Sequence, residues 1–295
     1  MKIYVSGATG FVGAHVAREL RERGADVRDE RIDLLDPIAL ERAVEGCEAV
    51  VHVAALYSYD ADPARIEAVN VGGTRNVLEA CARRGVSRIV YTSTAGTCGP
   101  VPGRPATEAD SPPLWELEIP YKRTKLAAER LGLEAGAVVV NPTTPVGDGD
   151  RKPTPTGRTI AEVAKGRIKG YVATTGLNVV DVGDVARGHA LALEHGRPGE
   201  RYLLGGVDLS LGDLFAAIAD LAGRARPSVR VPYAFAVLAG KAGIVNADEV
   251  RLARLPMYFS SKKAENRLGY KAGPVEPALA RAVREAQNVD GKGGA

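Results

Sequence analysis

The chain has 295 residues, enough for one large α/β unit or two unequal domains with an ample core. Its 39 Lys and Arg residues are interspersed with 36 Asp and Glu residues, and the net charge of +3 gives no reason to expect a nucleic-acid or membrane partner. No apolar stretch approaches the ~20 residues of a spanning helix, no signal peptide is apparent, and three cysteines without metal-like spacing suit a reducing cytoplasm. We therefore expect a cytoplasmic protein without a metal site.

Strand and helix patterns alternate along the chain as far as about residue 190. Apolar runs predict strands at 2–6, 25–28, 49–54, 88–92 and 137–141, and helical patterns lie at 14–23, 37–45, 63–84 and 121–134. Later helices are predicted at 211–222 and 274–287. The alternation predicts an α/β fold built on a doubly wound parallel sheet, followed by a smaller, mixed α/β part.

A glycine-rich segment follows the first predicted strand, with Gly7, Gly10 and Gly13 at the spacing of a dinucleotide-binding loop. Gly7 allows a tight turn, Gly10 lets backbone N–H groups approach a pyrophosphate, and Gly13 lets the next helix pack on the strand. The N-terminus of that helix directs partial positive charge at the phosphates. The expected domains are therefore an NAD(P)-binding Rossmann domain at 1–156, to which 177–195 returns, a substrate-binding part at 157–287, and a flexible tail at 288–295.

The second motif is the pair Tyr121 and Lys125, which lies 108 residues after the glycine loop. The two side chains lie one turn apart on a predicted helix. A phenol with a pKa near 10 is a poor base at neutral pH, but the lysine charge favours the phenolate and lowers the pKa of the tyrosine. Tyr121 can then take or give the proton that accompanies hydride transfer at an alcohol or carbonyl.

Together these motifs resemble the extended (atypical) short-chain dehydrogenase/reductases of the NAD-dependent epimerase/dehydratase family, from residue 1 to about 286. Matching stretches lie at 6–13, 33–34, 51–55, 70–77, 91–95, 121–125, 141–144 and 180–186. Residues 152–158 and 176–182 are similar to hopanoid-associated sugar epimerases, and 93–97 resembles dihydroflavonol reductases.

The resemblance implies a catalytic trio of Thr94, Tyr121 and Lys125, in which Thr94 holds the substrate oxygen and Lys125 bonds the nicotinamide ribose. Ser93 is the alternative to Thr94. The implied cofactor contacts are Gly7, Thr9, Gly10, Phe11, Val12, Gly13, Arg31, Asp33, Leu34, Val53, Ala54, Ala55, Asn70, Thr92, Tyr121, Lys125, Pro142, Thr143 and Thr144. The expected substrate residues are Tyr57, Ser93, Thr94, Trp115 and Arg158, within a pocket that includes 55–59. Trp115 either caps the substrate or anchors its loop.

The cofactor preference is read from residues 28–33. Family spacing puts Arg31 near the position that discriminates the 2′-phosphate, which favours NADP over NAD. Asp33-Leu34, which matches the family's pair beside the adenine, also follows the glycine loop after fewer residues than in most relatives. We therefore expect the helix that usually connects the second and third strands to be missing, which would relax the specificity of the adenosine pocket.

Three functions are compatible with these residues. The first is hydride transfer of the epimerase/dehydratase type on a sugar or polyol-like alcohol or ketone, the second is an NADPH-dependent carbonyl reductase, and the third is a non-enzymatic NADP sensor. Ala95 and Gly96 stand where 4,6-dehydratases of the family carry an Asp-Glu pair, so dehydration is not expected. Residues 172–181 contain no Lys or Arg that could bind a diphosphate, which argues against a nucleotide sugar as the substrate. A homodimer through the helices after Pro63 and around Tyr121 is possible, as in many relatives.

Overall fold

The main sheet has six parallel strands in a computed structural model that describes residues 1–57 and 61–291. Its order is β2 (Asp26–Arg28), β1 (Lys2–Ser6), β3 (Ala49–His52), β4 (Arg88–Thr92), β5 (Val138–Pro142) and β9 (Arg201–Leu204). Val5 lies opposite Val51, Val51 opposite Val90, and Val90 opposite Val138. Such continuous apolar runs suit a parallel sheet that is covered on both faces.

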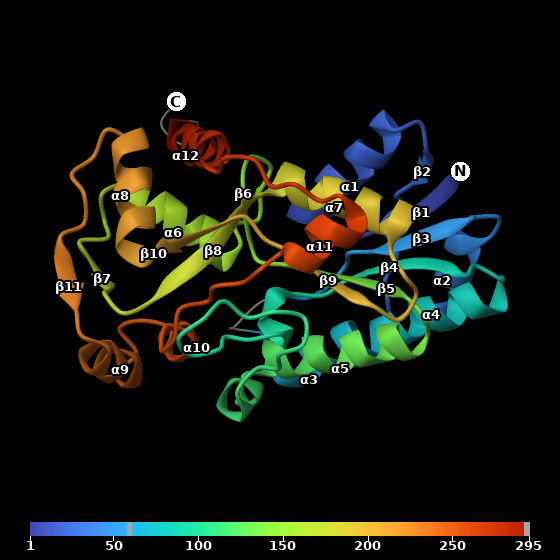
Figure 1. The fold of residues 1–295 in the computed structure, drawn as a ribbon, viewed down its shortest axis with the longest axis horizontal. Helices are drawn as coiled ribbons and strands as arrows, with labels where there is room; N and C mark the ends of the chain where they lie inside the picture. Colours follow the sequence, from blue (N-terminus) through green and yellow to red (C-terminus); the bar gives the residue numbers. More distant parts are fainter. Residues whose placement is uncertain (58–60, 292–295) are drawn as a thin grey trace.

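Helices cover both faces of this sheet (Figure 1). On one face, α1 (Phe11–Glu22) and α7 (Val182–His195) bury Val16, Leu20 and Leu193 against it. On the other, α2 (Pro37–Val44), α4 (Gly73–Arg83) and α5 (Pro120–Glu134) bury Leu40 and Val77. The doubly wound Rossmann arrangement expected from the sequence is therefore confirmed.

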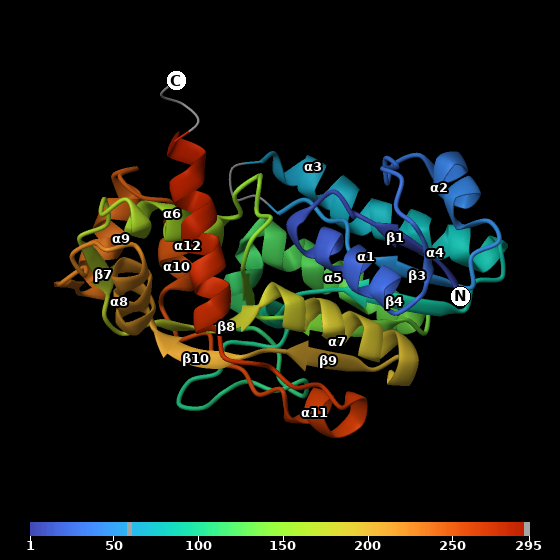
Figure 2. The same ribbon diagram turned by 90° about the horizontal axis from the view of Figure 1, so that it is seen from above.

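A smaller group of elements lies at one end of the main sheet (Figure 2). It contains a three-stranded sheet of β10 (Val207–Ser210), β8 (Gly176–Asp181) and β6 (Thr144–Val146), and the pair β11 (Val229–Val231) and β7 (Gly170–Val172). The helices α6 (Pro155–Ala164), α8 (Leu211–Leu221) and α12 (Glu276–Gly291) pack on it around Ile160, Phe215 and Leu279. The C-terminal half also contains the helices α9 (Tyr233–Lys241), α10 (Ala247–Leu252) and α11 (Lys262–Leu268).

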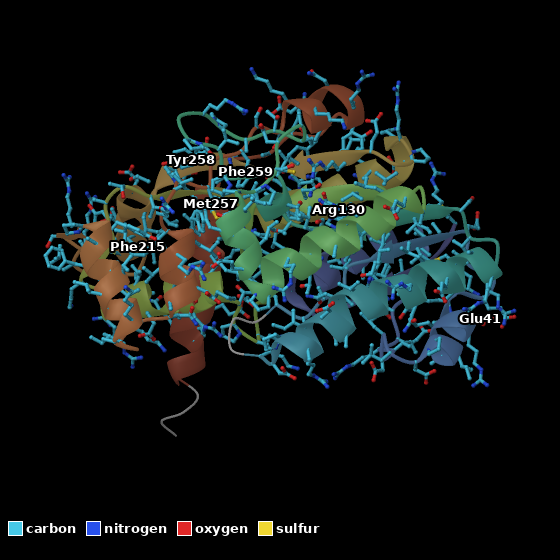
Figure 3. The ribbon with its side chains drawn as sticks, turned by 90° about the horizontal axis from the view of Figure 1, so that it is seen from below. Glu41, Arg130, Phe215, Met257, Tyr258 and Phe259 are labelled. Atoms are coloured by element: carbon cyan, nitrogen blue, oxygen red, sulfur yellow. The ribbon has the colours of Figure 1, made fainter. Side chains whose placement is uncertain are left out.

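A segment at residues 257–259 joins the two groups of elements (Figure 3). Met257 forms a β-bridge with Leu177 of β8, and Phe259 forms one with Ala106 in the loop after β4. The C-terminal part of the chain thus contacts both the small sheet and a loop at the edge of the main sheet.

The structure differs from the sequence expectations at four places. The expected absence of a connecting helix between the second and third strands is wrong, because α2 lies there, at the helical pattern predicted for 37–45. The predicted helix at 63–84 is divided into α3 (Pro63–Glu67), a π-helical turn η1 (Ala68–Gly72) and α4. Within the segment 177–195, which was expected to return to the Rossmann domain, α7 packs on the main sheet but β8 belongs to the small sheet, and the later strand β9 joins the main sheet. Finally, α12 continues to Gly291, past the start of the expected tail, and 292–295 lie outside the described residues.

Candidate active site

The glycine loop between β1 and α1 has the geometry of a phosphate cradle. Gly7 has a φ of +75°, and a Cβ there would lie 2.7 Å from the Ala54 backbone. A Cβ on Gly13 would lie 2.2 Å from the Gly7 carbonyl oxygen, so the helix can approach the strand only at glycine. A Cβ on Gly10 would meet only that same oxygen, at 3.2 Å, which leaves its outer side open. Because α1 has no side-chain cap, its first N–H groups remain available for an anion.

The other predicted residues of the loop surround this cradle. Thr9 is exposed, while Phe11 and Val12 are half-buried in the first turn of α1. The Phe11 ring lies edge-on to His15, 5.9 Å between centroids. Val53 and Ala54 continue β3 beneath the loop, where their amides donate to the backbone and side chain of Ser6. These residues fit a dinucleotide pyrophosphate.

The residues expected beside the adenine lie in the β2–α2 connection. Leu34 is buried, and a Cβ on Gly73 would lie 2.7 Å from the Leu34 Cβ. Asn76 fixes Leu34 further by donating to its carbonyl oxygen at 2.9 Å. The Asp33 carboxylate accepts from the Leu35 amide, and Arg31 is exposed with no ion-pair partner among the described residues.

Lys125 is buried at the carboxyl end of β4. Its Nζ donates to the Tyr91 hydroxyl at 2.8 Å and to the Thr92 carbonyl at 2.7 Å. Burial lowers the pKa of Lys125 to about 7, with Glu129 opposing this shift. The pKa of Tyr121 is raised by burial, and by the neighbouring hydroxyls of Tyr57 and Tyr91. This shift of the Tyr121 pKa is opposite to the one expected from the sequence, because burial of the phenol dominates and Lys125 is bonded to Tyr91 and Thr92.

Hydroxyl and amide groups gather where β4 and β5 end. The side chains of Ser93, Thr143 and Asn141 each hold a buried oxygen that has no hydrogen-bond partner within the described residues. Thr94 follows β4, and its Oγ1 accepts a 3.3 Å bond from the Gly96 amide. Pro142 ends β5 and Thr144 begins β6 on the same edge. Ligands bind at this edge of doubly wound sheets, so the unpartnered groups fit a cofactor and substrate there.

Asn70 holds the segment after β3 in place. It lies in η1, where its side chain accepts from the Leu56 amide at 2.7 Å and donates to the Leu56 carbonyl at 3.1 Å. It also donates to Thr124 of α5 at 3.3 Å. Asn70 therefore fixes the backbone beside Ala55 and Tyr57, and such π-helical turns are frequent at functional sites.

The predicted substrate residues occupy different surroundings. The Tyr57 ring lies 4.5 Å from that of Tyr121, whereas 58–59 lie outside the described residues. Trp115 lies under Arg254, whose guanidinium is 5.5 Å from the ring centroid, and this contact supports its role as a loop anchor. Arg158 is exposed in the first turn of α6.

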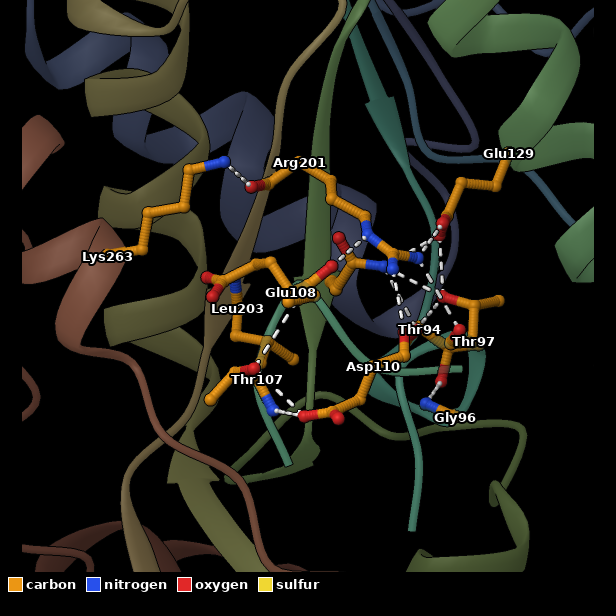
Figure 4. Close-up of polar contacts among 12 residues, drawn as sticks. Thr94, Gly96, Thr97, Thr107, Glu108, Asp110, Glu129, Arg201, Leu203 and Lys263 are labelled. Carbon is orange, nitrogen blue, oxygen red and sulfur yellow. Dashed lines mark hydrogen bonds and ion pairs between the residues drawn. The ribbon is translucent and has the colours of Figure 1, made fainter. Parts of the chain in front are cut away.

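Several polar residues of the site region were not predicted as functional. Figure 4 shows the buried Glu129 of α5 bonded to Arg201 of β9 and to Thr97. Charged residues at strand and helix positions are usually solvated, so no sequence signal distinguished these two. Cys98 is packed in the core, and burial raises the pKa of its thiol to about 12.

Comparisons with known proteins agree with this geometry. Residues 3–205 match the model of the NAD dependent epimerase/dehydratase family. The chain is 36% identical to a "Putative dihydroflavonol 4-reductase" of Synechocystis sp., over 97% of this chain and 94% of that one. It is 34% identical to "Sterol demethylase protein B" of Methylococcus capsulatus, covering 79% and 78%.

A solved structure of an epimerase has the same fold as this chain. The crystal structure of a nucleoside-diphosphate-sugar epimerase from Pseudomonas aeruginosa superposes with a TM-score of 0.83 at 28% identity, covering 98% of both chains. The cradle, the parallel sheet and the matched residues lead to one conclusion: this chain belongs to the NAD-dependent epimerase/dehydratase family.

Proposed function

We propose that this NAD(P)-dependent oxidoreductase transfers hydride between its cofactor and the alcohol or ketone of a substrate without a diphosphate, using Thr94, Tyr121 and Lys125. The observation that carries the proposal is the gathering of unpartnered polar groups around Thr94 and the buried Lys125, at the edge that also holds the glycine cradle. That edge is the ligand-binding edge of the fold.

Each residue has a defined task in this mechanism. The bound nicotinamide supplies or accepts the hydride. The α1 N-terminus holds the pyrophosphate, and Thr94 donates a hydrogen bond to the substrate oxygen. In reduction, Tyr121 gives its hydroxyl proton to that oxygen; in oxidation, its Oη takes the proton of the alcohol. The charge of Lys125 would favour the phenolate, and its amine would bond the ribose of a bound cofactor.

Within the described residues, the pairing of the cation that reaches β8 supports a substrate without a diphosphate. Arg281 reaches this strand, but it is bonded to both Asp181 oxygens and to Asp148, all at 2.8 Å. A cation that is already neutralised by two carboxylates offers little attraction to a phosphate. The relative named as a dihydroflavonol reductase, which aligns with nearly the whole chain, also supports a carbonyl reductase.

An epimerase acting on a sugar or polyol-like alcohol is the second candidate. It is supported by the solved sugar epimerase, which covers 98% of this chain. The two candidates differ in how they treat the cofactor, since an epimerase must return the hydride to the same substrate. Denaturing the purified protein and identifying the released nucleotide separates them: near-stoichiometric NAD(P) favours the epimerase, and a nucleotide-free protein that binds NADPH reversibly favours the reductase.

Tyr121→Phe tests the proton-transfer step. The loss of a positioned acid should lower the rate of NADPH-dependent ketone reduction about 10²–10⁴-fold. NADPH affinity should stay within about threefold, since the change removes one hydroxyl. Reduction of a dihydroflavonol and of simple aliphatic ketones, followed by NADPH absorbance, is the assay. Activity retained in the variant would remove Tyr121 from the reaction.

A further inference from the structure

The Glu129 carboxylate is the centre of a buried polar network behind the catalytic residues. It lies one turn after Lys125 on α5, with a side chain only 1% exposed. Its Oε1 accepts from Arg201 Nη1 at 2.7 Å, and its Oε2 accepts from Thr97 Oγ1 at 2.6 Å and from Asn141 Nδ2 at 2.7 Å. Three separate elements therefore converge on one carboxylate (Figure 4).

The network reaches the backbone of Thr94. Thr97 Oγ1 lies 2.8 Å, and Asn141 Nδ2 3.1 Å, from the Thr94 carbonyl oxygen. Thr97 has a single hydroxyl proton, and its shorter contact is with Glu129. The two amide protons of Asn141 then remain for Thr94 and the other acceptors. The carboxylate thus determines which way the donors around Thr94 point.

Arg201 extends the same network to the loop after β4. Its Nε donates to the Glu108 carbonyl at 2.9 Å, and its Nη2 donates to the Asp110 carbonyl at 2.8 Å. A guanidinium offers its donors in a rigid fork, so it fixes the relative position of everything it bonds. Glu129 and Arg201 together connect α5, β5, β9, the turn at 94–97 and the loop at 107–110.

We propose that Glu129 and Arg201 are positioning residues that aim the Thr94 hydroxyl at the substrate oxygen through Thr97 and Asn141. This inference rests on the proposed role of Thr94. A buried ion pair is weak evidence for stability, because desolvation of the charges offsets their attraction. The contacts of the Glu129–Arg201 pair with the turn that carries Thr94 instead indicate that the pair positions this turn.

The proposal is tested with Glu129→Gln and with the pair Thr97→Val and Thr97→Ser. Glu129→Gln keeps the shape of the side chain but removes its charge, and Thr97→Val removes only the hydroxyl. We expect both to lower kcat for ketone reduction about 10–100-fold, as a misplacement of about 1 Å does, with the KM for NADPH nearly unchanged. Thr97→Ser keeps the hydroxyl, so this variant should retain a kcat near that of the wild type. Asp184→Asn is the matched control, since Asp184 is an equally buried carboxylate that pairs with Arg187 and bonds the Gly273 amide, away from this turn.

A double-mutant cycle with Thr94→Ala identifies the route of the effect. If Glu129 acts through Thr94, Glu129→Gln should cost little more in the Thr94→Ala background, whereas independent losses would multiply. Crystal structures of Glu129→Gln and Asp184→Asn with NADP⁺ should show a displaced Thr94 in the first variant alone. An unmoved Thr94, or multiplying losses, would overturn the positioning role. Full activity of Thr94→Ala would overturn the proposed catalytic trio instead.

Discussion

At the scale of single residues, Lys125 has the most unusual environment among the catalytic candidates. It is 2% exposed, and its pKa is lowered to about 7 by burial. The unfolded chain, in which lysine titrates near 10.4, therefore binds more protons than the folded chain between about pH 7 and pH 10. Wild-type stability should accordingly rise with pH across this window.

Lys125→Met should remove this pH dependence. The free energy of unfolding of the wild type, measured relative to the variant, should increase by about 2–3 kcal/mol between pH 7 and pH 9.5. Urea unfolding at the two pH values gives the comparison. Lys169→Met is the control, because Lys169 is exposed, and it should leave the difference constant. A constant difference for Lys125→Met would contradict the burial of a charged amine at this position.

Arg31 carries the prediction on cofactor preference. Its guanidinium is exposed without an ion-pair partner in the described part of the chain, whereas the nearby Arg28 pairs with Glu30 and Arg21 with Asp29. If Arg31 binds the 2′-phosphate, Arg31→Ala should weaken NADPH binding about tenfold and leave NADH binding unchanged, since charge-assisted bonds to phosphate are the strong ones. Titration of protein fluorescence with each nucleotide measures both. Equal effects on the two cofactors would exclude this role.

At the scale of elements, the sequence predicted strands and helices best where burial is uniform. The strands β1 and β4 have the predicted ends, because their apolar runs are covered on both faces. The strands β6, β7 and β11 have only three residues each, and β6 contains Pro145, so no periodicity marked them. Arg201 begins β9 with a charge, which concealed the sixth strand of the main sheet.

The same contrast holds for the candidate site. Its glycine loop was visible because steric demands select glycine at fixed spacing, and a Cβ at Gly7 or Gly13 would indeed overlap the backbone. The contact of Lys125 with Tyr91, and that of Glu129 with Arg201, depend on how distant elements meet in space. No local pattern encodes such contacts, so the sequence could not predict them.

Gly72, the last residue of η1, and Gly73, the first residue of α4, provide a matched pair for testing the expected adenine pocket. A Cβ on Gly73 would lie 2.7 Å from the Leu34 Cβ, whereas one on Gly72 would meet nothing within 4 Å. Gly73→Ala must displace Leu34, so we expect cofactor affinity to fall about tenfold and stability to fall by about 1–3 kcal/mol, as overpacking does. Gly72→Ala should stabilise by about 0.5–1 kcal/mol and leave affinity unchanged. Thermal unfolding and NADPH titration of both variants are the measurements, and similar behaviour of the two would contradict the Leu34 contact.

At the scale of the whole molecule, the main sheet packs against apolar side chains on both of its faces. None of the helices in the described residues is long and apolar enough to cross a bilayer. A buried histidine joins a helix to the sheet on each face. His52 lies 2.7 Å from Ser6 and 3.1 Å from Thr74 of α4, and His189 of α7 lies 2.9 Å from Thr92. Burial lowers their pKa values to about 3 and about 4.

These histidines should determine how the molecule unfolds in acid. Unfolded histidine titrates near pH 6.5, so the unfolded chain binds more protons than the folded chain from there down to about pH 4. The stability that the neutral rings provide is complete above pH 6.5 and is lost as the pH falls towards the pKa values of the two rings in the folded chain.

The variant His189→Gln removes one such ring. Between pH 7 and pH 4.5, this variant should lose about 2 kcal/mol less of its free energy of unfolding than the wild type loses. His195→Gln is the control, since His195 is on the same helix but 57% exposed, and it should follow the wild type in urea unfolding at both pH values. Equal pH dependence of His189→Gln and the wild type would mean that another group controls acid unfolding.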